Sequence, residues 1–352
     1  MKREEFSPRA PAFRVGDWAE VRGLDEIMET LDAQGRLDGM PFMPEMARYC
    51  GFRFRIAKSA HKTCDPTGQT NMRKLVDSVH LQTRCDGSAH GGCEARCLIF
   101  WKTAWLKRVD GPSCTRVDAP PNNAALEQLQ AHAQHETEDG IRYCCQATEI
   151  VRATTPLSRN EFSQYVDDIA TGNVSSAHVA QQCMAVLTKA ALTRLGRLNG
   201  RGAQAKPPQL RSADAKPLNL REGELVRIRP AKDILATLDG NGKHRGLALE
   251  AEMLRYCGRV FRVAGRVNRI IDEASGKMVA IRNDCIVLDG LVCRGLDNSG
   301  RLFCPRSPFF YWREAWLERA EPAHEMVTAS PVPYPAAAAA IISPACPFEK
   351  HP

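Results

Sequence analysis

The strongest constraint on the fold of this chain is a repeat within its own sequence. GDWAEVR at 16–22 matches GELVRIR at 223–229, and EMARYCGFRFRIA at 45–57 matches EMLRYCGRVFRVA at 252–264. Both matches have the same offset of 207 residues. Because self-similarity at a fixed offset reflects a repeated structural unit, the pattern predicts two homologous modules.

The two copies also end in similar segments, WKTAWLKR at 101–108 and WREAWLER at 312–319. With the openings, these segments delimit a first module at 14–110 and a second at 220–320. Each module contains short runs of alternating apolar and polar residues separated by loops of uneven length, which is typical of short β-strands. Closing such strands into a small barrel removes the exposed edges that a short open sheet leaves.

The opening GDWAEVR or GELVRIR, the YCG turn before an alternating strand and the closing WREAWLER resemble the SH3-like barrel of nitrile hydratase beta subunits. The resemblance covers each module but not the region between them. In that family the beta subunit does not supply the catalytic metal ligands, so the resemblance implies a fold and no functional residue. The expected fold class is therefore α+β, with two SH3-like modules flanking a helical insert.

The remaining segments differ from the modules. The insert, 111–200, contains NNAALEQLQAHAQH, LSRNEFSQYVDDI and SSAHVAQQCMAVLTKAALTRLGRL, whose apolar residues recur three or four positions apart and predict three helices. Residues 201–219 are rich in Pro and Ala without periodicity and predict a linker. Residues 1–13 are expected to form an N-terminal arm, and the Pro/Ala-rich residues 321–352 a flexible tail.

The chain contains fourteen cysteines, and their meaning depends on the compartment. No apolar run approaches the roughly 20 residues that cross a bilayer, and the first residues lack the apolar core of a secretory signal. We therefore expect a cytoplasmic protein, in which clustered thiols are more often metal ligands or redox groups than disulfides. The net charge of +7 is spread along the chain, so neither a nucleic acid nor a membrane is the favoured partner.

The first module has the denser group of thiols, and four of them are the candidate metal ligands: Cys64, Cys85, Cys93 and Cys97. Four thiolates can close a tetrahedral zinc site or hold an iron-sulfur cluster. The glycines between Cys85 and Cys97 would let the loop fold back so that the sulfur atoms converge. His80 or His90 could replace Cys64, which would give a zinc site with three thiolates and one imidazole.

A second group is expected to bind a cofactor between the second module and the insert: Cys145, Cys285, Cys293 and Cys304. In the alignment of the modules, Cys85 pairs with Cys293 and Cys97 with Cys304, whereas Cys93 has no counterpart. Three thiols of the second module would leave one coordination position for Cys145 (or its neighbour Cys144) or for a substrate. The alternative is that Cys285 and Cys293 are small core residues.

Two functions are consistent with these sites. With structural zinc, the protein would be a cytoplasmic accessory or interaction module, because metal replaces the core that a small barrel lacks. With an iron-sulfur cluster, it would be an enzyme doing redox or sulfur-transfer chemistry at the second, incompletely ligated site. The partner would be a protein or a small-molecule substrate bound where the insert meets the barrels. Metal identity, substrate and oligomeric state stay open at this point.

Overall fold

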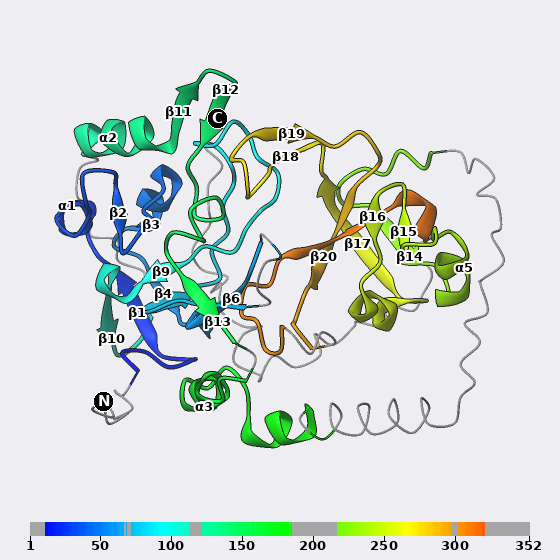
Figure 1. Ribbon diagram of the computed structural model, residues 1–352, viewed down its shortest axis with the longest axis horizontal. Helices are drawn as coiled ribbons and strands as arrows, with labels where there is room; N and C mark the ends of the chain where they lie inside the picture. The colour runs from blue at the N-terminus through cyan, green and yellow to red at the C-terminus, as the bar shows by residue number, and fades with distance from the viewer. Residues whose placement is uncertain are drawn as a thin grey trace.

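The computed structural model describes residues 11–66, 68, 72–112, 122–158, 160–182, 184, 217–296 and 301–320. In Figure 1 the first repeat (14–110) is blue to cyan on one side of the molecule, and the second (220–320) is yellow to orange on the other. The middle region (111–200), in green, runs along the first repeat and leads to α3 at its edge. The architecture is mixed α+β with several small antiparallel sheets.

The first repeat is built on two three-stranded sheets, in the orders β10-β1-β4 and β5-β8-β9. In β1, Ala19 and Val21 are fully buried, and Glu20 between them is also buried and pairs with Arg53 and Lys107. Its strands are β1 (Trp18–Val21), β2 (Arg36–Leu37), β3 (Met40–Pro41), β4 (Arg53–Arg55), β5 (Lys58–Ser59), β6 (Lys62–Cys64), β7 (Met72–Lys74), β8 (Ser78–His80), β9 (Trp101–Lys102) and β10 (Leu106–Val109). Its helices are α1 (Leu24–Met28) and the 3-10 helices η1 (Pro44–Tyr49) and η2 (Thr103–Trp105).

The second repeat has one five-stranded sheet in the order β21-β20-β17-β14-β22. The three strands at one end of this sheet, β22-β14-β17, have the same order as β10-β1-β4 of the first repeat. Its strands are β14 (Leu225–Ile228), β15 (Lys243–His244), β16 (Leu247–Ala248), β17 (Val260–Arg266), β18 (Arg269–Ile271), β19 (Met278–Ala280), β20 (Ile286–Val292), β21 (Phe309–Trp312) and β22 (Leu317–Arg319). Its helices are α5 (Ala231–Ala236) and the 3-10 helices η3 (Ala251–Tyr256) and η4 (Glu314–Trp316).

The repeated tryptophans form the centre of both cores. Trp105 and Trp316 are fully buried, and each donates its indole N–H to a threonine hydroxyl. Trp105 Nε1 is 3.1 Å from Thr30 Oγ1, and Trp316 Nε1 is 2.9 Å from Thr237 Oγ1. The two threonines are themselves 207 positions apart, so the same hydrogen bond occurs in both repeats.

The middle region is only partly helical. α2 (Asn123–Ala133), α3 (Ser163–Ala170) and the helical residues 176–182 match the three predicted helices. The expectation of a wholly helical insert is wrong, because β11 (Gln134–Thr137) and β12 (Gly140–Tyr143) form a hairpin and β13 (Thr155–Leu157) pairs with β7. The Asp139-Gly140 dipeptide is the turn signal that the helical interpretation overlooked. Within the ranges that the structure describes, no helix has the length and apolarity that crossing a bilayer requires.

Several predicted segments fall wholly or largely outside the described residues. These are residues 1–10 of the arm, 201–216 of the linker, the tail from 321 and the end of the third helix.

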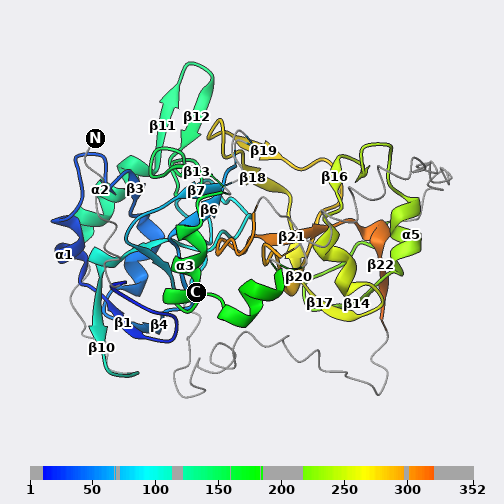
Figure 2. The same cartoon turned by 60° about the horizontal axis from the view of Figure 1, so that its bottom comes forward.

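The two repeats contact each other through two β-hairpins, one from each repeat. In Figure 2, β18–β19 of the second repeat extends toward the first, and β6–β7 of the first repeat lies next to the second. Glu94 N donates to Arg269 O (3.0 Å), and Ile271 N donates to Cys93 Sγ (3.4 Å). On the other side, Lys58 Nζ donates to Ser307 Oγ (2.9 Å). The loops that carry the cysteines therefore lie at the boundary between the repeats.

Candidate metal centre

Thiols from two regions of the chain meet in one small cavity of about 40 Å³. Three of the four cysteines predicted to form the first site line it, together with one from the middle region: Cys85, Cys93, Cys97 and Cys145. Cys64, the fourth predicted ligand, does not line this cavity and lies beside Cys304 instead. The structure thus brings together a different set of thiols from the one that spacing indicated.

The loop between Cys85 and Cys97 folds back on itself at its glycines. Gly87 has φ +73°, and a Cβ there would lie 2.1 Å from the carbonyl oxygen of Cys93. Gly91 has φ +61°, and a Cβ there would lie 2.2 Å from Tyr143 Oη. Only glycine fits both the left-handed backbone and the close approach, so these positions bring the two ends of the loop to the cavity.

A carboxylate and an imidazole adjoin the first of these thiols. Cys85 Sγ donates to Glu45 Oε1 (3.0 Å), and His90 Nδ1 lies 3.2 Å from the same oxygen. The candidate ligand atoms of Glu45, Cys85 and His90 all lie within 4.8 Å of one another. Glu45 and His90 are buried, with side chains 1% exposed. Among the described residues this is the one group of three or more Cys, His, Asp or Glu side chains that converges in this way.

The hydrogen bonds of His90 determine which nitrogen faces the group. Nε2 lies 3.3 Å from the carbonyl oxygen of Cys144, which can only accept, so Nε2 carries a proton. Nδ1 is therefore the nitrogen that lies beside Glu45 and Cys85. A backbone carbonyl that orients the far nitrogen in this way is the usual support of a metal-bound histidine.

One oxygen of Glu45 has no partner. Oε2 is buried and without a hydrogen bond, although its carboxyl is charged. Burial raises the pKa of Glu45, but hydrogen bonds and charge from His90, with a further hydrogen bond from Cys85, outweigh burial and hold it below its ordinary value. A buried anionic oxygen without a partner is costly, and a cation at this point would satisfy it.

Three of the thiols around the cavity, those of Cys85, Cys97 and Cys145, are neutral when no cation is present. Burial and then the Glu45 carboxylate raise the pKa of Cys85. Burial raises the pKa of Cys97 to about 12 and that of Cys145 to about 11. A metal ion would have to displace these protons, so its binding should release protons and strengthen as pH rises.

The cysteines predicted to form the second site pack in different hydrophobic clusters. Cys285 packs with Ala264, Val267 and Val287, which supports the alternative that it is a core residue. Cys293 packs against the core of the second repeat, Cys304 beside Met72 and Cys145 in the core of the first repeat. The four side chains thus occupy four different clusters, and the structure does not bring them together as a cofactor site.

The backbone also corrects the alignment of the cysteines. Cys93 N donates to His90 O and Cys304 N to Arg301 O, both at 3.2 Å. Cys85 N donates to Cys97 O, whereas Cys293 N donates to Pro308 O. Cys93 therefore corresponds to Cys304, and Cys97 has no cysteine counterpart. The expected pairing of Cys97 with Cys304 is wrong because the second loop is three residues longer before Cys304, not after it.

Sequence reasoning missed Glu45 and treated the histidines as second choices. The signal for Glu45 is present, since EMARYC and EMLRYC keep an acid at 45 and 252. Of the two histidines, His90 joins the group and His80 does not. His80 is fully buried, stacks near Phe100 and lies with Nδ1 2.8 Å from Ile99 O.

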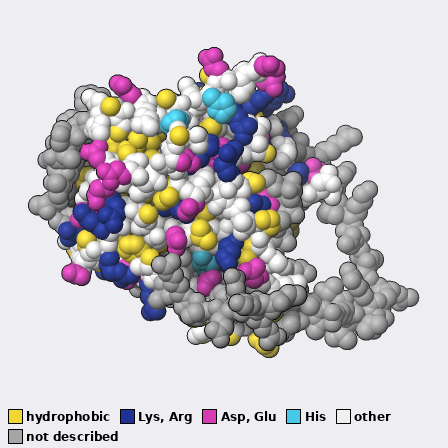
Figure 3. Space-filling view, turned by 60° about the vertical axis from the view of Figure 1, so that its left-hand side comes forward, with side chains coloured by type: hydrophobic (Ala, Val, Ile, Leu, Met, Phe, Trp, Pro, Cys, Tyr) yellow, Lys and Arg dark blue, Asp and Glu magenta, His cyan; other side chains and the backbone are white. Residues whose placement is uncertain are grey.

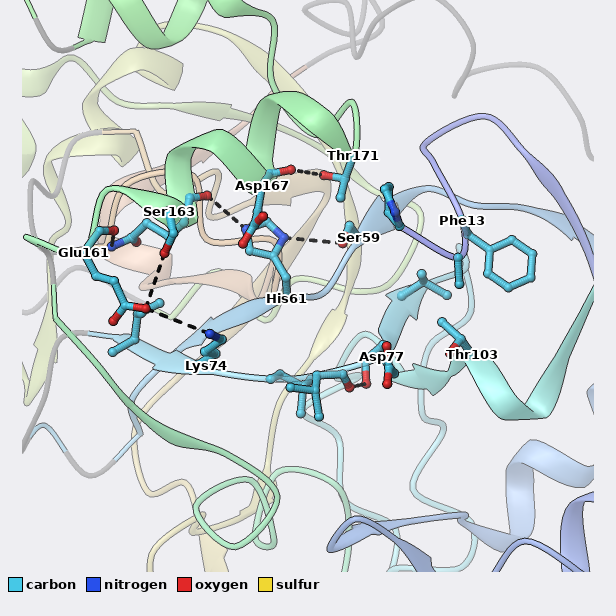
Figure 4. A pocket seen from close by; sticks show the side chains of 18 residues that line it. Phe13, Ser59, His61, Lys74, Asp77, Thr103, Glu161, Ser163, Asp167 and Thr171 are labelled. Carbon is cyan, nitrogen blue, oxygen red and sulfur yellow. Dashed lines mark hydrogen bonds and ion pairs between the residues drawn. The ribbon is translucent and has the colours of Figure 1, made fainter. Parts of the chain in front are cut away.

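A larger pocket of about 340 Å³ lies between β5, β8 and α3. Figure 4 shows its polar side chains, among them His61, with Nδ1 3.4 Å from Ser59 Oγ and Nε2 3.3 Å from the Asp168 carboxylate. Lys74 and Glu161 face each other at 3.9 Å. None of the described cysteines lines this pocket, so it is separate from the thiol cavity.

Comparisons with protein-family models, curated proteins and solved structures found no match to this chain. Any function of the chain is therefore inferred from the geometry of its own residues.

Proposed function

We propose that the first repeat binds one zinc ion through Glu45, Cys85 and His90. The ion would have a structural role, and the chain would be an accessory or interaction protein. The observation that carries this proposal is the unpartnered, buried Oε2 of Glu45 within a group of three convergent ligands. Zinc accepts this combination of sulfur, nitrogen and oxygen donors. The fourth position would face Cys93, Cys97 and Cys145, which line the same cavity as Cys85 and His90.

The donor set favours a single ion over an iron-sulfur cluster. Clusters are held mainly by thiolates, whereas a carboxylate and an imidazole are two of the three convergent donors here. A cavity of about 40 Å³ also has room for an ion and little more. The redox or sulfur-transfer enzyme has no comparable support, because its four proposed ligands lie in separate clusters.

The size of the cavity also favours a structural role for the ion. Pockets that bind organic ligands have volumes of roughly 300–1,000 Å³, and the thiol cavity is far smaller. The ion would instead join η1, the 85–97 loop and the Cys144 carbonyl of the middle region. A small repeat with short strands buries little apolar surface, so a bound ion would add to the free energy of unfolding that its core provides.

We propose SH3-like barrels for both repeats, with cytoplasmic location and a protein partner as part of the same hypothesis. The shared order of β10-β1-β4 and β22-β14-β17 supports a common fold. Figure 3 shows acidic and basic side chains interspersed on one face of the first repeat, as on an ordinary solvated protein surface.

Elemental analysis of the purified chain tests the metal site. We expect about one zinc per chain and its loss in Cys85→Ser and His90→Ala. The matched control is Cys293→Ser, which removes the corresponding thiol of the second repeat and should keep the zinc. Iron with acid-labile sulfide, or zinc retained in Cys85→Ser, would contradict the proposal.

A further inference from the structure

We propose that Cys64 and Cys304 form a redox-responsive pair that closes into a disulfide between the two repeats when a hydroperoxide is present. This inference is independent of the proposed zinc site, since neither cysteine belongs to the Glu45–Cys85–His90 group. It assigns a role to two of the four predicted ligands that the thiol cavity does not include.

Cys64 and Cys304 lie together because the β6–β7 hairpin of the first repeat contacts the second repeat. Cys64 is the last residue of β6 in the first repeat, and Cys304 lies in the second repeat, in the turn where its N–H donates to Arg301 O. The two side chains pack in one apolar cluster with Met72 and Leu157. Both cysteines are free.

An arginine prepares one member of the pair for reaction. Arg306 Nη1 donates to Cys64 Sγ at 3.8 Å, and its other nitrogen is held by Glu273. The hydrogen bond from Cys304 and the charge of Arg306 outweigh burial and lower the pKa of Cys64 to about 6. The Cys64 thiolate and burial raise the pKa of Cys304. At neutral pH the pair is therefore one thiolate and one thiol.

The exposure of the two residues indicates the order of the reaction. Cys304 is 4% exposed, whereas Cys64 is partly exposed and is the member that a small oxidant reaches. The Cys64 thiolate would attack one oxygen of the hydroperoxide, which breaks the O–O bond and gives a sulfenic acid and hydroxide. The Cys304 sulfur would then attack the Cys64 sulfur, and its proton leaves with the hydroxyl as water. The two thiols lose two electrons, and the peroxide gains them.

The other side of the interface provides an internal control. The residue that corresponds to Cys64 there is Ile271, and the residue that corresponds to Cys304 is Cys93. Ile271 N donates to Cys93 Sγ at 3.4 Å, so the same hairpin contact exists with a single thiol. The contact thus belongs to the fold, and the second sulfur is particular to the Cys64 side.

The experiment is peroxide oxidation of the full-length chain, followed by alkylation of remaining thiols and peptide mass mapping. We expect a Cys64–Cys304 cross-linked peptide that disappears on reduction. Cys304→Ser should instead trap a sulfenic acid on Cys64 that reacts with dimedone, and Cys64→Ser should give neither product. Cys93→Ser, the matched variant on the other side, should keep the cross-link.

The rate gives a second readout that does not depend on the cysteine variants. Arg306→Gln should slow the reaction of Cys64 with peroxide roughly tenfold near pH 7, because fewer Cys64 side chains are then thiolate. The proposal is overturned if oxidised wild-type protein contains no Cys64–Cys304 peptide, or if Cys64 goes directly to sulfinic acid. Zinc content is measured on the same samples. A missing cross-link in protein that contains zinc overturns the thiol pair alone, and a cross-link in protein without zinc overturns the metal site alone.

Discussion

The two repeats share the turn that ends at Cys93 and at Cys304, but the loop before that turn is three residues longer in the second repeat and its side chains differ. In the first repeat Glu45 lies beside Cys85 and His90, and one of its oxygens is unpartnered. In the second, both oxygens of Glu252 accept from the backbone N–H of Arg294 (3.0 and 3.2 Å). The position of His90 is taken there by Arg301. The comparison teaches that the turn belongs to the fold, while the side chains around it decide whether it offers ligands for a cation.

The largest difference that we expect between the repeats is at Lys62 and its counterpart Arg269. Lys62 is fully buried, with Nζ 2.5 Å from the equally buried Asp168 of α3, whereas Arg269 is exposed. Lys62→Met should lower the free energy of unfolding by about 3–5 kcal/mol, because Asp168 loses its ammonium partner. Arg269→Met should cost less than about 1 kcal/mol. Urea denaturation measures both, and equal losses would contradict the comparison.

Acid should affect the first repeat before the second. Burial lowers the pKa of His80 to about 3, and Val287 occupies the corresponding position. Since the unfolded chain takes up this proton near pH 6.5, stability should fall as pH drops from about 6.5 toward 3, by about 3 kcal/mol between pH 7 and pH 4. Hydrogen exchange of the two repeats against pH checks this. His80→Val should remove that part of the acid dependence, and an unchanged pH profile in the variant would refute it.

The smallest expected difference concerns the tryptophan hydrogen bonds. Thr30→Val and Thr237→Val remove the acceptors of Trp105 and Trp316, each leaving a buried indole N–H without a partner. Each change should cost about 1–2 kcal/mol, and the two losses should agree. Thermal or urea unfolding of the two variants makes the measurement. A clearly unequal pair would show that the two cores have diverged more than their hydrogen bonds indicate.

The repeat allowed much of the local structure to be predicted, but not the grouping of the thiols. The buried tryptophans and the helices α2 and α3 follow from patterns within a few residues of each other. Cys145 and Cys304 reach their neighbours through contacts between distant segments, and spacing along the chain carries no information about these. The similar distances from Cys85 to Cys97 and from Cys293 to Cys304 also concealed a three-residue difference in loop length.

The exchanged hairpins have the form of a two-fold dimer contact within a single chain. Position 271 of the second repeat meets residue 93 of the first, and the corresponding position 64 meets residue 304. In a symmetric homodimer both contacts would have to be identical, because one sequence supplies both. Joining the copies in one chain removes that restriction and keeps the partners at high effective concentration. Each of the two contacts is then free to acquire its own chemistry, the proposed ion beside one and the proposed pair of thiols at the other.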